Sequence, residues 1–77
     1  MQKNNYAAFV FQFAEGLYFR GFHPRFLDNK RIFTTRNLED AKRFDRENTE
    51  ELENAMRYMD DLEVQYQLAI CLFPKEN

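Results

Sequence analysis

The chain has 77 residues and a net charge of −2, with 44% hydrophobic and 31% charged residues, which predicts one domain over residues 1–77 with residues 1–5 and 75–77 frayed. Nine Phe and four Tyr exclude the aromatic-poor composition of a disordered chain. A single cysteine excludes an intramolecular disulfide and suits a reducing cytoplasm, and the longest apolar run, residues 6–14, is too short to span a membrane.

The first expected element is a hairpin of two strands. Residues 6–13 alternate phenylalanine with other residues, as a strand does, and a three-residue loop ending at Gly16 leads to a second strand over residues 17–22. Gly16 is expected in the left-handed conformation. Pairing Phe13 with Leu17 divides the side chains between two faces. The first face holds Phe9, Phe11, Phe13, Leu17 and Phe19, and the second holds Ala8, Val10, Gln12, Tyr18, Arg20 and Phe22.

The middle of the chain predicts shorter elements. Residues 23–30 form a loop, because a proline near its start donates no ladder hydrogen bond. Residues 31–35 form the third strand. Asn37 is placed to cap a helical turn over residues 38–42 with its side chain, and Phe44 then adds a short bridge to the sheet.

A long helix over residues 49–63 has the clearest pattern. Asn48 or Thr49 caps it, and Asn48 with Glu51 has the spacing of a capping box. Its apolar side chains recur at helical spacing and form one stripe. They are Leu52, Ala55, Met56, Met59 and Leu62. Residues 66–73 are expected to be the last strand.

These elements predict an α+β domain in the order β-β-β-α-β. We expect a three- or four-stranded, mainly antiparallel sheet with one amphipathic helix packed on one face. One helix covers only one face of a small sheet, and the phenylalanine face is the more apolar. The helix is therefore expected on that face, which leaves the second face either free or covered by the loop over residues 23–30.

No pattern in the sequence indicates catalysis. The chain has no serine, a single histidine, His23, and a single thiol, Cys71, in an apolar strand where a thiolate is disfavoured. Adjacent carboxylates at 39–40 and 60–61 point about 100° apart on a helix, so they are solvated rather than an acid–base pair. We therefore expect no enzyme activity, no cofactor and no metal site.

The chain also resembles a group of proteins. An aromatic hairpin, a central segment, an acidic helix and a closing strand follow one another. The central segment reads Phe33-Thr34-Thr35-Arg36-Asn37-Leu38-Glu39-Asp40-Ala41-Lys42-Arg43-Phe44. This order resembles small accessory proteins of bacteriophages and prophages. The resemblance implies a cytoplasmic inhibitor that binds and blocks a bacterial host protein, of an anti-defence type such as an anti-CRISPR.

Two surfaces are candidates for binding that partner. Tyrosine and arginine are enriched at protein interfaces, and they gather on the second face of the hairpin and just beyond it. This first candidate surface consists of Tyr18, Arg20, Phe22 and Arg25. The alternative is the acidic helix, which could imitate phosphates in a basic groove. Its residues are Glu50, Glu53, Asp60 and Asp61, partly neutralised by Arg57.

Three other roles stay open. A nucleic-acid-binding module would use the aromatics and cations interleaved in residues 18–26, although a loop falls where its strand should continue. A homo-oligomer that sequesters a small ligand would need a pocket between subunits. A homodimer through the exposed sheet face or edge would add burial to a thin core.

Overall fold

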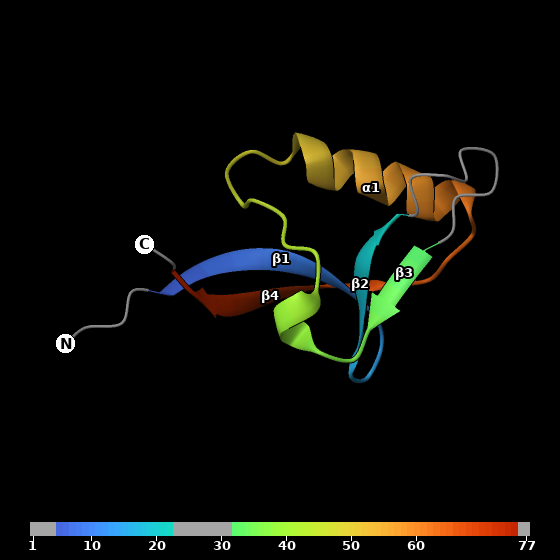
Figure 1. Ribbon diagram of the computed structural model, residues 1–77. Helices are drawn as coiled ribbons and strands as arrows, with labels where there is room; N and C mark the ends of the chain where they lie inside the picture. The colour runs from blue at the N-terminus through green and yellow to red at the C-terminus, as the bar shows by residue number, and fades with distance from the viewer. Residues whose placement is uncertain (1–4, 23–31, 76–77) are drawn as a thin grey trace.

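The computed structural model describes residues 5–22 and 32–75, which form a four-stranded antiparallel sheet and one α-helix (Figure 1). The expected α+β fold is confirmed. The elements are β1 (Asn5–Ala14), β2 (Leu17–Phe22), β3 (Ile32–Thr35), the 3-10 turn η1 (Leu38–Asp40), α1 (Glu50–Asp61) and β4 (Gln67–Pro74). Across the sheet the order is β3-β2-β1-β4, so the first and last strands of the chain are neighbours and β4 lies at an edge.

The turn between β1 and β2 is tighter than the sequence predicts. Ala14 pairs with Leu17, so the predicted pairing of Phe13 with Leu17 is wrong. Gly16 has a φ of 74°, which confirms its left-handed conformation and lets the turn close over fewer residues. An irregularity between Gln12 and Ala14 then absorbs the extra residue in β1 as a bulge.

The segment from Lys42 to Phe44 joins the sheet between β1 and β2. The amide of Lys42 donates to the carbonyl oxygen of Phe19 at 2.9 Å. Phe44 and Phe9 exchange backbone hydrogen bonds at 2.9 and 3.0 Å and form an isolated antiparallel bridge, which confirms the expected bridge at Phe44. This bridge brings the Phe44 ring into the core, where it is 2% exposed.

The helix packs on the phenylalanine face, as predicted. Phe11, Phe19 and Met59 are each at most 1% exposed at the centre of this cluster. The Phe11 ring makes edge-on contacts with Phe44 at 5.2 Å and with Tyr66 at 4.8 Å between centroids. Such aromatic pairs add to the area that each ring buries. The main core of this short chain is thus built largely from aromatic rings in edge-on contact.

The opposite face is also covered, so the prediction that it lies free is wrong. Ala8, Val10, Ala41 and Phe73 form a second buried cluster, each at most 6% exposed. The cover comes from the chain after β3, because η1 crosses this side of the sheet, away from α1 (Figure 1). Small side chains on β1 allow that close approach. Each face of the sheet therefore has its own core.

An arginine closes the edge of this second cluster. The Arg43 guanidinium lies 4.1 Å from the centroid of the Phe73 ring, at cation–π distance. It also donates to the Tyr6 hydroxyl at 2.9 Å and to the Glu39 carbonyl oxygen at 3.2 Å. Arg43 thereby connects the segment after η1 to both β1 and β4.

The predicted side-chain caps of Asn37 and Thr49 do not form, whereas Asn48 Oδ1 accepts a hydrogen bond from the backbone amide of Glu50 at 3.5 Å. The side chain of Asn37 makes no cap hydrogen bond, and the backbone N–H of Asn37 donates to Thr35 Oγ1 at 3.0 Å. Thr49 is the N-cap residue of α1, but its hydroxyl donates to Glu53 Oε2 at 2.7 Å. Glu51, expected in a capping box, forms an ion pair with Lys42 at 3.0 Å. The ion pair of Glu51 joins α1 to the segment after η1, whereas the contacts of Asn37 and Thr49 are local.

The helix ends before the predicted residue 63. Leu62 follows α1 as its C-cap and is exposed, so the predicted apolar stripe is buried only as far as Met59. Glu63 then takes a φ of 56°, and this left-handed residue turns the chain toward β4.

Candidate functional site

The first predicted surface does not lie on one side of the sheet. Tyr18 is half-buried against the second cluster, and Arg20 is exposed. Phe22, predicted on the same face, lies on the helix side, with its ring 4.9 Å from Phe19 and 5.3 Å from Tyr58. The ladder between β2 and β3 is irregular between Phe19 and Gly21, which shifts the alternation of side chains. Arg25, like His23, lies outside the described residues.

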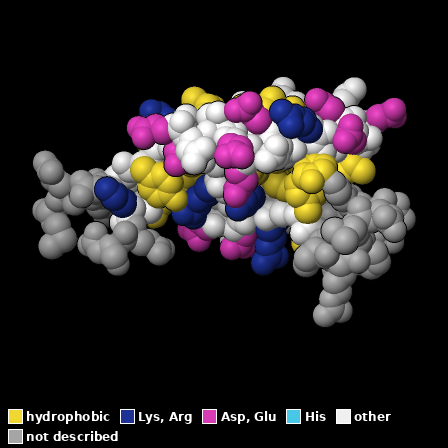
Figure 2. All heavy atoms as spheres, turned by 90° about the horizontal axis from the view of Figure 1, so that it is seen from above, with side chains coloured by type: hydrophobic (Ala, Val, Ile, Leu, Met, Phe, Trp, Pro, Cys, Tyr) yellow, Lys and Arg dark blue, Asp and Glu magenta, His cyan; other side chains and the backbone are white. Residues whose placement is uncertain are grey.

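The acidic residues predicted as the alternative binding surface lie on α1 and are exposed to solvent. Glu50, Glu53, Asp60 and Asp61 are all exposed, and acidic side chains gather over α1 in Figure 2. The expected pairing of these acids with Arg57 is not seen. Within residues 5–22 and 32–75, the ion pair is that of Lys42 with Glu51. The acidic surface is thus less neutralised than its spacing predicts.

A third surface, on β4, was missed by the sequence reasoning. We call Leu68, Ile70 and Leu72 the outer row; they are 39%, 60% and 68% exposed. They share one face of β4, as predicted, and they lie opposite Phe11, Phe9 and Ala7 of β1. Because directly opposite residues project to the same side, the outer row lies on the side of the sheet that carries α1. The helix buries Phe11 yet leaves the outer row in solvent.

The backbone of the outer row points to the free edge. Phe9 uses its amide and carbonyl for the bridge to Phe44, so these groups point away from β4. In an antiparallel ladder, hydrogen-bonded pairs alternate with non-bonded pairs, and the pair of Phe9 with Ile70 is therefore non-bonded. Ala69 and Cys71 then bond to β1. It follows that Leu68, Ile70 and Leu72 direct their N–H and C=O groups away from the sheet.

This edge carries little protection against another strand. Proteins commonly guard edge strands with lysine, proline, bulges or inward charges. From Gln67 to Phe73 the chain has no charged residue and no proline. Pro74 ends the strand and, lacking an N–H, also ends its capacity to donate. The outer edge of β4 therefore presents backbone groups that can pair with another strand, and the apolar side chains of the outer row lie beside them.

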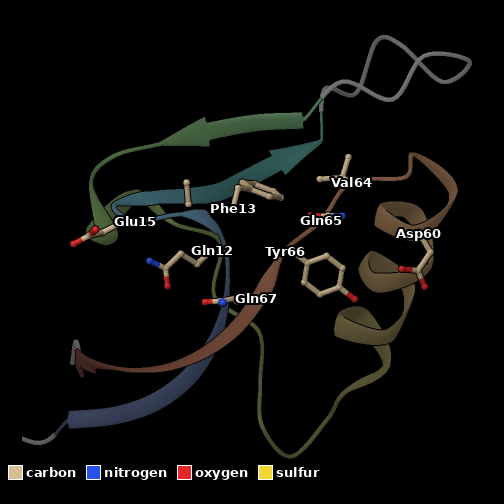
Figure 3. A pocket seen from close by; sticks show the side chains of 9 residues that line it. Gln12, Phe13, Glu15, Asp60, Val64, Gln65, Tyr66 and Gln67 are labelled. Carbon is tan, nitrogen blue, oxygen red and sulfur yellow. The ribbon is translucent and has the colours of Figure 1, made fainter.

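A hollow lies between the hairpin turn and the end of α1 (Figure 3). Its volume is about 700 Å³, and Gln12, Glu15, Asp60 and Tyr66 are among the residues around it. Burial, with a smaller contribution from the Asp60 carboxylate, raises the pKa of Tyr66 above its ordinary value. The lining offers amides, carboxylates and a phenol that can hydrogen-bond, but it brings no nucleophile next to a base.

The described residues hold neither a candidate metal site nor a membrane-spanning helix. Among them, no three His, Cys, Asp or Glu side chains are grouped so that they could hold a metal ion. None of the helices in residues 5–22 and 32–75 has the length and apolar character needed to cross a membrane. Cys71 is half-buried against the second cluster.

No protein-family model matches this chain, and comparisons with curated proteins and with solved structures found no match.

Proposed function

We propose that this protein acts without catalysis, by binding a strand of another polypeptide at the edge of β4. The observation that carries the proposal is the outer row, whose side chains are 39% to 68% exposed on a strand whose outer edge pairs with no strand among residues 5–22 and 32–75. Scattered exposed apolar residues are ordinary, but a continuous row of them marks an interaction surface.

Strand addition would provide partners for both the backbone polar groups and the apolar side chains at this edge. The outward N–H and C=O groups would gain backbone partners, and alternate side chains of the incoming strand would lie beside the outer row. Fully burying one Leu or Ile side chain is worth about 1.5–3 kcal/mol. Because the outer row is already partly covered, its contribution is a fraction of that for each residue. A partner with apolar side chains at every second position would fit best.

The test is co-purification of the tagged protein from bacterial cells, comparing Ile70→Lys with Thr34→Lys. Both substitutions add one positive charge to an exposed residue of an edge strand, β4 in the first case and β3 in the second. A partner bound at β4 is retained by wild type and Thr34→Lys and lost from Ile70→Lys. A partner retained equally by all these forms would place binding elsewhere and contradict the proposal.

A second candidate function is inhibition of a bacterial protein that binds nucleic acid, as the phage resemblance implies. The observation that favours it is the set of exposed acids on α1, which Arg57 does not pair with in the described part of the chain. Such a complex would weaken steeply with salt, as binding to a charged groove does. Replacing Glu50, Glu53, Asp60 and Asp61 by the corresponding amides should abolish it while the strand edge stays unchanged.

A further inference from the structure

We infer that the strand bound at the β4 edge is β4 of a second copy of this chain. This inference rests on the proposed function, since it names the partner of the same edge. The two copies would pair antiparallel about a two-fold axis and join their sheets into one continuous sheet.

The backbone groups of the outer row permit a symmetric register. Outward-pointing groups lie on Leu68, Ile70 and Leu72, at every second residue. If Ile70 lies opposite Ile70 of the second copy, then Leu68 lies opposite Leu72 and Leu72 opposite Leu68. Each of these pairs is then a hydrogen-bonded pair of an antiparallel ladder. No outward N–H or C=O of the outer row is left without a partner.

The side chains match in the same register. Opposite residues of an antiparallel pair project to one side of the sheet, so both outer rows would meet on the side that carries α1. Both helices would then flank one shared apolar strip. Every residue of the outer row would face an aliphatic residue of the other copy. Ile70 and Leu72 are the most exposed large hydrophobic residues described in the chain, at 60% and 68%, and they would gain the most burial.

The charges at the two ends of β4 favour antiparallel self-pairing. Glu63 precedes the strand and Lys75 follows it, and both are exposed. An antiparallel partner brings Lys75 of one copy toward Glu63 of the other, at each end of the interface. A parallel partner would instead set like charges together. The strand between these residues is uncharged, so nothing within it repels a second copy.

Pairing through one strand makes a small interface, well below the roughly 1,600 Å² of a standard complex. We therefore expect a dissociation constant of about 10–100 µM rather than a permanent dimer. Sedimentation velocity of the full chain over about 2–500 µM tests this. The mass should rise with concentration from the 9.4 kDa of one chain toward twice that value. A constant monomer mass over this range would overturn the inference.

Substitutions of Ile70 test the register most directly, because Ile70 would lie opposite Ile70 of the second copy at the two-fold axis. Ile70→Lys and Ile70→Glu each place like charges opposite each other, which is destabilising in a sheet. Each variant alone should dimerise at least ~30-fold more weakly than wild type, and Thr34→Lys should dimerise normally. An equimolar mixture of Ile70→Lys with Ile70→Glu should recover association. A dimer that survives both single substitutions, or a mixture that stays monomeric, would contradict the register.

Folding is checked for each variant by its urea unfolding midpoint, and Leu72→Lys serves as a second interface variant if Ile70→Lys is unfolded. The inference and the proposed function fail in different ways. A monomer whose capture of another bacterial protein depends on Ile70 would overturn self-pairing and keep the proposed function. A monomer whose captured proteins do not depend on Ile70 would overturn both.

Discussion

Phe9 and Phe44 exchange backbone hydrogen bonds of 3.0 and 2.9 Å, although they are far apart in the sequence. The bridge turns the polar backbone groups of Phe9 away from β4. Phe44 therefore fixes which residues of β4 bond to β1 and which direct their backbone groups outward. It does so although Phe44 itself bonds to β1 and not to β4. A contact in the centre of the sheet thus decides which backbone groups the protein offers at its margin.

Amide exchange should reveal this alternation along β4. In dilute protein, the amides of Ala69 and Cys71 bond to β1 and should exchange slowly, whereas those of Leu68, Ile70 and Leu72 should exchange quickly. Nuclear magnetic resonance of the protein transferred into heavy water measures each amide separately. At high concentration the second group should also become protected. Slow exchange at Ile70 in dilute protein would mean that the alternation is shifted by one residue.

The bridge also makes Phe44 important for stability. Its ring is 2% exposed and contacts Phe11 and Phe19, so Phe44→Ala should lower the free energy of unfolding by about 3–5 kcal/mol. Phe33→Ala is the matched control, because Phe33 is 45% exposed on β3. Its cost should be about 1 kcal/mol or less. Urea unfolding followed by circular dichroism compares the two, and equal losses would argue against a core built around Phe44.

Arg43 should resist replacement by lysine. The guanidinium stacks on Phe73 while donating to the Tyr6 hydroxyl and the Glu39 carbonyl, a geometry that an ammonium does not reproduce. Arg43→Lys should therefore cost about 1 kcal/mol of unfolding free energy. Arg46→Lys, at an exposed position, should change it by less than about 0.5 kcal/mol. The difference between their urea midpoints is the measurement.

Tyr66 should make stability depend on pH in the alkaline range. Its pKa is raised in the folded protein by burial and by Asp60, so the fold favours the neutral phenol. This contribution is fully present below the ordinary tyrosine pKa and is lost as pH rises through the folded value. The free energy of unfolding should fall more steeply above about pH 10 for wild type than for Tyr66→Phe. Parallel slopes in urea unfolding at successive pH values would contradict this placement of Tyr66.

Periodic patterns in the sequence predicted the elements well but not their local details. Alternating phenylalanines indicated β1, and helical spacing indicated α1 and the burial of Leu52, Ala55 and Met59. The cap predicted at Thr49 was wrong because its hydroxyl donates to Glu53 in the folded chain, and the side chain of Asn37 makes no cap hydrogen bond. The face of Phe22 was wrong because a bulge changes the alternation without leaving a clear residue signature.

What the sequence determined by itself was therefore the α+β class, the order of elements and the phenylalanine core, since these follow from local periodicity and apolar content. Only the tertiary structure decided that η1 covers the second face and that β4 pairs with β1 at an edge. Both depend on contacts between residues far apart in the chain, which no local pattern encodes. For that reason the same alternation that marks β4 as a strand could not tell that Ile70 and Leu72 would stay in solvent.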